Sequence, residues 1–358
     1  MVIPFAQANV VRSEPRAKAA RVVHGRPGVQ VGFWISSEEH GPTEMVRAAQ
    51  HAEAAGFPYV QLSDHFHPWI DRQGQSPFVW SVIGGIAATT KLTVGTGVTC
   101  PIIRIHPAIV AQAAATSSVM LEGRFFLGLG TGENLNEHVI GRGWPPIEAR
   151  RDMLEEAIDV LRTLFRGGER SFRGRYFTVE DARLYTASES PPPIYVAAGG
   201  PKSAELAARA GDGLIAANPD NELVAKYEGA GAQGNPKYIE VQVCWSRDAA
   251  AARRLAHELW PTGALGGQLA QELRRPSDFE AAVEHVTLEK STKHTPVGPD
   301  VEPYVKAVRN CVDAGFDHIG LHQIGPDQEG FLTFWEKELR SALESAGLPK
   351  ARGVSPAR

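Results

Sequence analysis

Residues 92–130, LTVGTGVTCPIIRIHPAIVAQAAATSSVMLEGRFFLGLG, contain one complete strand–helix–strand unit. The β-branched run Leu92–Thr99 predicts a strand, Pro107–Leu121 predicts a helix, and Phe125–Gly130 predicts the next strand. Short apolar runs flanked by helices are typical of parallel strands that are covered on both faces. The unit therefore predicts an α/β protein built on a parallel sheet.

The same alternation continues in both directions from this unit. The other runs that predict strands are Val29–Ser36, Tyr59–Asp64, Ile194–Ala198, Gly213–Ala217, Tyr238–Trp245 and His318–Ile324. The other predicted helices are Thr43–Ala55, Phe78–Thr90, the amphipathic stretch Leu154–Phe165, Ser203–Ala210, Ala249–Leu259, Pro303–Ala314 and Phe331–Ala346. Eight strand–helix units fit a (β/α)8 TIM barrel better than an open sheet. We expect insertions after strand four, where SFRGRYFTVEDARLY (171–185) reads as extended chain, and after strand seven, at about 261–300.

Length and composition define the domains and exclude one class of partner. The chain has 358 residues, 43% hydrophobic and 22% charged, which suits a single barrel domain over residues 28–347. We expect residues 1–27 to form a mobile arm, or one that packs on a partner subunit, and residues 348–358 to form a disordered tail. With 37 Lys and Arg against 41 Asp and Glu, the net charge is -4, which argues against nucleic-acid binding.

Cysteine use and the N-terminus indicate the cellular compartment. Cys100, Cys244 and Cys311 lie far apart and match no disulfide or zinc pattern. The sequence has no run of about 18 apolar residues, the length that a membrane span needs. Its N-terminus also lacks the order of a secretory signal, in which charged residues precede an apolar run. A cytoplasmic protein is expected.

In a barrel of this kind the active site lies at the carboxyl ends of the strands, so the polar residues that follow each strand are the candidates. After the second strand comes Ser-Asp-His-Phe-His-Pro-Trp, residues 63–69. Asp64 could hold the ring of His65 in one tautomer and leave it as an acid or base near neutral pH. The alternative is an Asp-capped loop with a packed tryptophan. After the third strand, the glycines of GTGVTCP (95–101) either let the backbone approach a flat ligand or mark a bulge.

Glycine-rich segments also follow the fourth and fifth strands. In GLGTGEN (128–134), Glu133 stands where a dinucleotide fingerprint has its third glycine, so nicotinamide binding is not indicated. Glu133 could donate or accept a proton if burial raises its pKa, or it could cap a helix. The segment AGGPKS (198–203) opens a helix, and its free N–H groups beside Lys202 could bind a phosphate. The alternative is an ordinary turn between strand and helix.

Four of these segments, in this order, resemble the luciferase-like family of flavin and deazaflavin oxidoreductases. They are SDHFHPW, GTGVTCP with RIHPAIVAQA (104–113), FLGLGTGENLNE (126–137) and VAAGGP (196–201). They are most similar to the branch that depends on coenzyme F420, which includes glucose-6-phosphate dehydrogenase and hydroxymycolic acid dehydrogenase. GTGVTCP and HPAIVAQA (106–113) resemble the hydroxymycolic acid dehydrogenase especially. The similarity extends from about Val29 to Leu339. It implies an F420-dependent dehydrogenase or reductase that transfers a hydride between the deazaflavin and an alcohol or carbonyl substrate. We also expect a homodimer and no bound metal.

The resemblance implies a role for individual residues. The catalytic positions are His65 as base for the substrate hydroxyl, Glu38 as the glutamate that supports it, Trp69 over the reacting centre, and Glu133 as the carboxylate thought to protonate the ring. Gly97 and Val98 match a non-proline cis peptide behind the ring. The other cofactor-binding positions are Asp64, Thr131, Gly132, Asn136, Ala198, Gly199 and Gly200.

The chain departs from the sugar-phosphate members of the family where they bind phosphate. Those members use a lysine after strand six, a lysine–histidine pair in the insertion, and an arginine nearer the end. Here the matching positions hold Asp220, Ala270-Gln271 and His294, with only Lys293 and Lys290 nearby. An aspartate opposite a phosphate repels it, so we expect an unphosphorylated substrate. The alternative is an F420-dependent sugar-6-phosphate dehydrogenase.

Three further alternatives keep the fold but change the chemistry. His65-x-His67, with His322 after the last strand, resembles part of a metal-dependent hydrolase site, although such sites need more ligands. An FMN-dependent luciferase-like monooxygenase is the second alternative, and a non-catalytic binding protein is the third. Metal analysis, and titration with FMN against F420, separate these classes.

Overall fold

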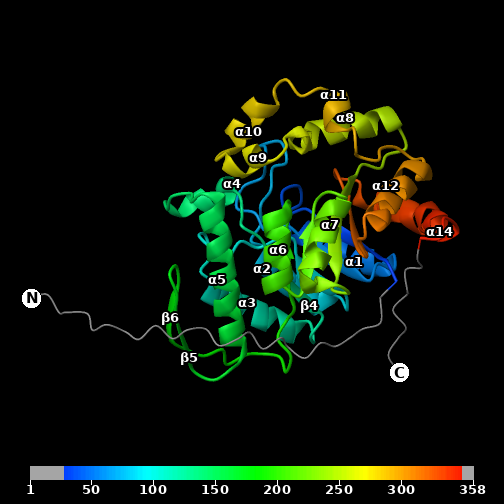
Figure 1. Ribbon diagram of the computed structural model, residues 1–358. Helices are drawn as coiled ribbons and strands as arrows, with labels where there is room; N and C mark the ends of the chain where they lie inside the picture. Colours follow the sequence, from blue (N-terminus) through cyan, green and yellow to red (C-terminus); the bar gives the residue numbers. More distant parts are fainter. Residues whose placement is uncertain (1–27, 349–358) are drawn as a thin grey trace, which may run out of the picture.

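The structure, a computed structural model, describes residues 28–348; the predictions of a mobile arm and of a tail from 349 onward lie outside the described residues. Eight parallel strands close into a barrel in the order β1, β10, β9, β8, β7, β4, β3, β2 (Figure 1). Their bounds are β1 Gln30–Ile35, β2 Tyr59–Leu62, β3 Thr93–Thr96, β4 Phe125–Leu129, β7 Ile194–Ala197, β8 Gly213–Ala216, β9 Lys237–Val243 and β10 His318–Gln323. The predicted TIM barrel is confirmed, and each predicted strand overlaps an observed one.

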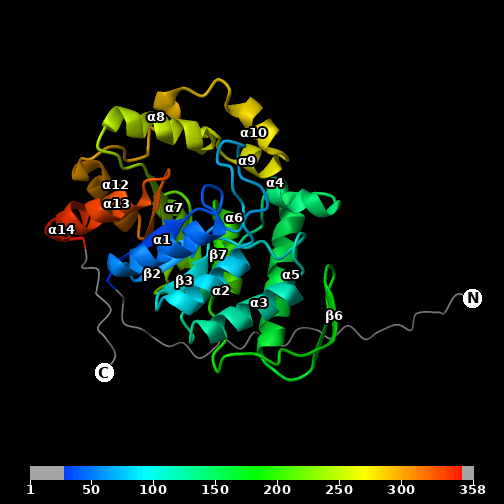
Figure 2. The same cartoon turned by 180° about the vertical axis from the view of Figure 1, so that it is seen from behind.

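Helices surround the barrel on all sides (Figures 1 and 2). Those of the ring are α1 Pro42–Ala54, α2 Val79–Thr89, α3 Pro107–Met120, α5 Ile147–Phe165, α6 Pro201–Ala210, α7 Asn221–Tyr227 with η2 Glu228–Ala232, α12 Val301–Asp313, and α13 Gln328–Phe334 continuing through η4 Trp335–Leu339 into α14 Arg340–Ser345. The helix α8 (Ala249–Leu259) lies over one end of the barrel (Figure 1). In α1, Met45, Ala49 and Ala52 recur at helical spacing and are all buried against the barrel. The helix α7 was not predicted, and the helix predicted over Phe331–Ala346 is longer, because α13 to α14 begins at Gln328.

Both predicted insertions are present. After β4 and α5, an antiparallel hairpin forms from β5 (Arg170–Arg173) and β6 (Thr178–Ala182). After β9 and α8, the segment predicted to be irregular contains four short helical turns, η3 Pro261–Ala264, α9 Gln268–Glu272, α10 Pro276–Val283 and α11 Leu288–Ser291. Together with α8 these turns form a roof over one end of the barrel (Figure 1). The short turns α4 (Asn134–Glu137) and η1 (His138–Ile140) follow β4.

Aromatic side chains fill the closed end of the barrel. Tyr59, Phe126, Tyr195 and Tyr238 are buried there, and their rings pack against one another at centroid distances of 4.8–5.3 Å. Glycines on the strands leave room for these rings, because a Cβ at Gly32 would lie 2.2 Å from the ring of Tyr59. Because these rings fill one end of the barrel, a ligand site is expected at the opposite end, under the roof.

The far end of the domain differs slightly from the prediction. Leu348, expected in the disordered tail, is 7% exposed and packs in the main core, and its N–H donates to the carbonyl oxygen of Leu343. The ordered domain therefore extends at least one residue beyond the predicted boundary at 347.

Candidate active site

The four segments singled out in the sequence lie at the carboxyl end of the barrel. They follow β2, β3, β4 and β7, which are consecutive neighbours in the barrel. Parallel strands bring their carboxyl ends to one edge, so these segments together form one half of the mouth. The other half is formed by the ends of β1, β10, β9 and β8.

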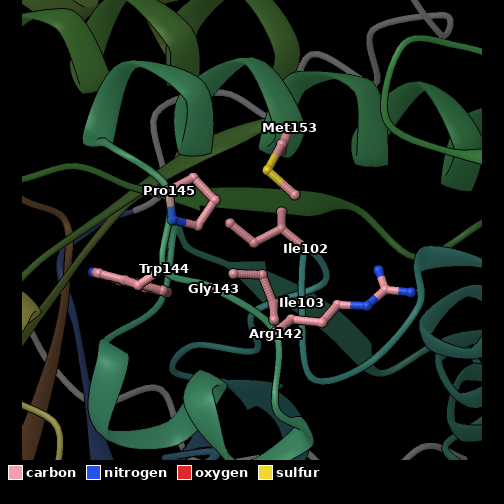
Figure 3. Close-up of a pocket in the computed structure, with 7 residues that line it drawn as sticks. All are labelled: Ile102, Ile103, Arg142, Gly143, Trp144, Pro145 and Met153. Atoms are coloured by element: carbon pink, nitrogen blue, oxygen red, sulfur yellow. The ribbon is translucent and has the colours of Figure 1, made fainter.

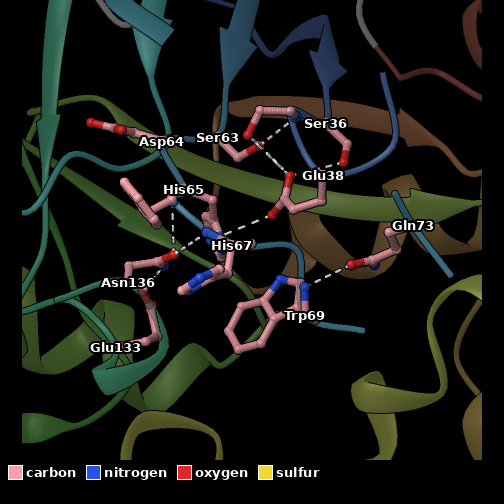
Figure 4. Close-up of polar contacts among 12 residues, drawn as sticks. Ser36, Glu38, Ser63, Asp64, His65, His67, Trp69, Gln73, Glu133 and Asn136 are labelled. Atoms are coloured by element: carbon pink, nitrogen blue, oxygen red, sulfur yellow. Dashed lines mark hydrogen bonds and ion pairs between the residues drawn. The ribbon is translucent and has the colours of Figure 1, made fainter. Parts of the chain in front are cut away.

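His65 faces a buried carboxylate at this mouth (Figure 4). Its Nε2 lies 3.4 Å from Oε1 of Glu38, and the two side chains are 10% and 3% exposed. Oε2 of Glu38 accepts hydrogen bonds from the hydroxyls of Ser63 at 2.5 Å and Ser36 at 2.9 Å. Burial raises the pKa of Glu38, but the neighbouring His65 and these hydroxyls outweigh it, so the pKa lies below its ordinary value. Glu38 is therefore an ionised partner for the imidazole.

Asp64 is not the partner of His65, so that expectation is wrong. Its Oδ1 accepts a hydrogen bond from Nη2 of Arg104 at 2.8 Å, and its Oδ2 accepts one from the hydroxyl of Thr99 at 2.7 Å. A buried carboxylate pairs with the nearest cation and hydroxyl because leaving it unpaired costs free energy. The glutamate implied by the family resemblance, Glu38, takes the place that the local sequence suggested for Asp64.

Trp69 links the histidine to the roof. Its ring centroid lies 5.1 Å from that of His65 and 5.2 Å from that of Phe279 on α10. Its backbone N–H donates to Oε1 of Gln73 at 2.8 Å, and Nε2 of Gln73 donates to the carbonyl oxygen of Leu259. The indole therefore packs between His65 and the insertion, and its position over a reacting centre stays a prediction.

Glu133 and Asn136 connect the segment after β4 to the segment after β2. Glu133 precedes α4, but its side chain does not cap that helix. Its Oε2 accepts a hydrogen bond from Nδ2 of Asn136 at 3.3 Å, and Oδ1 of Asn136 accepts from the backbone N–H groups of Phe66 (2.9 Å) and His67 (3.2 Å). Asn136 therefore ties the loop of the candidate acid to the loop of the candidate base, and its role in cofactor binding stays a prediction.

Some of the predicted cofactor positions are buried or tightly packed, and others have free space beside their backbone. The Gly97–Val98 peptide is cis, as the resemblance implied. Gly132 has a φ of +72°, and a Cβ there would lie 2.5 Å from Sγ of Cys100, so the turn beside the partly buried Thr131 needs glycine. Ala198 is buried, whereas a Cβ at Gly199 or Gly200 would meet nothing within 4 Å.

Lys202 does not complete an anion cradle at this turn. Its Nζ lies 3.8 Å from Oε1 of Glu148 on α5, and its side chain is 69% exposed. The open backbone at Gly199 and Gly200, at the start of the ten-residue helix α6, is what the segment offers to an anion.

Sequence reasoning missed a buried ion network beneath these loops. Besides Asp64, Arg104 contacts Glu137, whose Oε2 accepts from the backbone N–H of Arg104 at 2.6 Å. Burial raises the pKa of Glu137 to about 7, although Arg104 acts to lower it. Two signals were available: Arg104 is a lone charge in an apolar stretch, and Glu137 follows Glu133 at helical spacing. The network joins the loops after β2, β3 and β4.

Within residues 28–348, no group of three or more His, Cys, Asp or Glu side chains could hold a metal ion. In the suggested pair, His67 has Nδ1 2.9 Å from the carbonyl oxygen of Leu135 and stacks on His138. In the same part of the chain, no helix is long and apolar enough to cross a membrane.

A separate apolar pocket of about 460 Å³ lies beside α5 (Figure 3). Ile102, Ile103, Trp144 and Met153 are among its lining residues. Trp144 also contacts Arg150, whose guanidinium lies over its ring at 4.0 Å from the centroid. Arg150 is fully buried and donates to Gln271 and Glu272 of α9. Trp144 and Arg150 thus attach α9 to the barrel.

A closed barrel with a histidine–glutamate pair and a second carboxylate at its mouth defines a small-molecule enzyme scaffold. Residues 28–318 match the family described as luciferase-like monooxygenase, and the chain belongs to this family. The F420-dependent glucose-6-phosphate dehydrogenase of Kribbella flavida is 35% identical over 333 residues, which cover 89% of this chain and 99% of that protein.

Solved structures agree on the fold. An F420-dependent secondary alcohol dehydrogenase in complex with an F420–acetone adduct superposes with a TM-score of 0.82 at 28% identity, covering 88% of this chain and 99% of that one. The coenzyme F420-dependent tetrahydromethanopterin reductase of Methanopyrus kandleri has a TM-score of 0.72 at 20% identity, covers 88% of this chain and 100% of its own, and supports the fold alone.

Proposed function

We propose that this chain is an F420-dependent oxidoreductase that transfers a hydride between the deazaflavin and an unphosphorylated alcohol or carbonyl substrate. The observation that carries the proposal is the base and the acid on neighbouring loops, joined through Asn136, beside an open glycine turn. The relatives named above, which depend on F420, support the cofactor.

The residues of the mouth fit a flat ring with an anionic tail. The space over Gly199 and Gly200 is open, and the first N–H groups of α6 have no side-chain cap. Thr131 and Gly132 follow β4, and the Gly97–Val98 peptide follows β3, so they lie on the same half of the mouth as Gly199 and Gly200. These residues would hold the cofactor, which when bound supplies the hydride chemistry.

The side chains of this chain would manage the protons. Nδ1 of His65 lies 3.1 Å from the carbonyl oxygen of His67 and donates to it, so Nε2 is the atom that takes the proton of the substrate hydroxyl. Glu38, 3.4 Å from Nε2, stabilises the imidazolium that results. Oε1 of Glu133 has no hydrogen-bond partner among the described residues. This oxygen would hold the proton that the cofactor ring takes up.

The roof favours a substrate without phosphate. Ala270, which stands at the first position of the family's lysine–histidine pair, packs in an apolar cluster with Ile70, Leu135 and Phe279. Gln271, at the second position, bonds to Arg150 at 3.1 Å. The roof thus carries an alanine and an amide where those relatives carry the lysine–histidine pair, and this suits a neutral alcohol.

Asp220 supports the proposal less than its sequence position suggested. Its side chain is exposed, and Oδ1 accepts from the backbone N–H groups of Glu222 and Leu223 as the N-cap of α7. The alternative, a sugar-6-phosphate dehydrogenase, is favoured by the named activity of the relatives that are 35% identical, and would have to use the exposed Lys290 and Lys293.

Two measurements test the proposal. Fluorescence quenching should give a far lower Kd for F420 than for FMN; equal affinities would favour an FMN-dependent monooxygenase. Bleaching of oxidised F420 should then occur with propan-2-ol or another neutral secondary alcohol. Saturation with glucose 6-phosphate, without turnover of glucose or any secondary alcohol, would replace the substrate assignment by the sugar-phosphate alternative.

We also propose a homodimer and a cytoplasmic location. Four large apolar side chains lie 42–56% exposed at the start of α2 and along α3: Phe78, Ile109, Val119 and Met120. These helices pack against each other on one side of the barrel, so the exposed side chains form a face suited to a second copy of the chain.

A further inference from the structure

A second buried imidazole lies at the mouth, outside the residues used so far. His322 on β10 has Nδ1 2.7 Å from Oε1 of Glu240 on β9, and Nε2 3.1 Å from Oε1 of Glu39 in the loop after β1. Its side chain is 1% exposed. Ionised carboxylates only accept hydrogen bonds, so both ring nitrogens donate and the ring is an imidazolium. Burial lowers the pKa of His322, but the two carboxylates outweigh it and raise the pKa to about 10.

Glu39 is held from three sides. Besides His322, its Oε1 accepts a hydrogen bond from Nε1 of Trp260 at 2.6 Å, and its Oε2 accepts one from the backbone N–H of Gly325 at 2.7 Å. These donors come from β10, from the end of α8 and from the loop after β10. A carboxylate with three donors on separate elements has one available orientation. The loop after β1 is therefore fixed at Glu39.

Glu39 directly follows Glu38, the carboxylate that faces His65. Because the two side chains point to different neighbours, His322 on β10 for Glu39 and the loop after β2 for Glu38, fixing one sets the direction of the other. We propose that Glu39 and His322 are positioning residues that aim Glu38 at Nε2 of His65, an inference that rests on the proposed role of His65 as base. Alignment of this kind matters because a misplacement of about 1 Å can reduce turnover by about 10²-fold.

The charge of His322 also belongs to this role. Glu38, Glu39 and Glu240 bring three carboxylates to one side of the mouth, and His40, the other imidazole beside them, is buried, which lowers its pKa and keeps it neutral. Trp260 closes the group with its ring edge-on to His322 at 5.0 Å. The imidazolium offsets the negative charges of Glu39 and Glu240, the two carboxylates that it contacts.

The test compares E39Q and H322Q with the wild type and with E156Q. Glu156 on α5 accepts three backbone N–H groups of residues 175–177, so E156Q removes a bonded carboxylate away from the mouth. With F420 and propan-2-ol, E39Q and H322Q should lower kcat about 10- to 100-fold, with the Kd for F420 changed less than threefold. The isotope effect with 2-deuterated propan-2-ol should rise in these two variants and not in E156Q. The double variant E39Q/H322Q should recover part of the loss of H322Q, because it no longer leaves the buried charge of Glu39 without its imidazolium.

A second readout does not depend on turnover. In the cofactor-free protein, the NMR resonance of the His65 ring should move in E39Q in the same direction as in E38Q, and should stay in place in E156Q. Normal kcat per bound F420, an unchanged isotope effect and an unmoved His65 resonance in E39Q would overturn the inference, even if H322Q does not fold. If the wild type turns over no alcohol, the proposed function fails, and the His65 resonance alone decides the positioning role.

Discussion

At the scale of single residues, His65 and Glu133 should separate binding from chemistry. His65→Ala removes the group that takes the hydroxyl proton, so turnover should fall by about 10²–10⁴-fold. The Kd for F420, measured by fluorescence quenching, should change little, because the open turn at Gly199 and Gly200 lies on another loop. Near wild-type turnover together with loss of the cofactor would make His65 a structural residue and leave Glu38 or His67 as the next candidates for the base.

Glu133→Gln tests the acid while it keeps the side-chain shape. The amide can still meet Asn136, so F420 should still bind, but it cannot carry a proton and turnover should drop. The double variant H65A/E133Q should lose less than the product of the two single losses, since both residues serve one coupled step. Full multiplicativity in steady-state kcat/KM would indicate two independent steps.

At the scale of structural elements, Glu137 makes the stability of the loop network depend on pH. Its pKa is about 7 in the folded protein and near 4.5 in the unfolded chain, so between these values the folded state binds more protons. The free energy of unfolding should therefore fall as the pH rises from about 4.5 to 7, by up to about 3 kcal/mol from this group. Glu137→Gln, neutral throughout, should lose that slope in urea titrations, and equal slopes for the two proteins would contradict the buried carboxyl.

Substitutions of Asp220 test whether this residue caps the helix α7 or selects the substrate. As an N-cap, Asp220 should tolerate Asn, whereas Asp220→Ala should destabilise the protein by about 1 kcal/mol in chemical denaturation. Neither substitution should create activity with glucose 6-phosphate. Should Asp220→Asn alone allow saturation with that sugar phosphate, the charge of Asp220 would instead be a determinant of the substrate.

At the scale of the whole molecule, the apolar face of α2 and α3 predicts self-association. Light scattering after size exclusion should give about twice the chain mass, and Ile109→Glu should shift the protein toward the monomer, because a charge placed in an apolar interface is costly. The matched substitution Leu269→Glu on the roof helix α9, where Leu269 is 47% exposed against 56% for Ile109, should leave the mass unchanged. A monomeric wild type would assign the exposed side chains another partner.

Local sequence patterns were enough for the barrel and for most of its helices. Each strand of the barrel is a short apolar run, and the helical spacing of Met45, Ala49 and Ala52 predicts which face of α1 is buried. The exceptions have local causes: α7 is seven residues long and carries a weak pattern, and η4 widens the helix after β10 by a π-helical turn. The segments that bear the mouth were also recognisable, because polar residues after an apolar strand stand out in one dimension.

Only the tertiary structure decided which of these polar residues pair. Asp64 precedes His65, yet it bonds to Arg104, forty residues away, while Glu38 and His322 come from opposite ends of the chain to flank the same mouth. Closure of the barrel places β1 beside both β2 and β10, so partners are chosen by strand order and not by separation along the chain. Buried charges then bind whichever counter-charge or donor this order brings within about 3 Å, because an unpaired charge cannot remain in the interior. Sequence alone therefore determines the fold and the chemical groups of the mouth, and the closed barrel determines the pairing that gives each group its role.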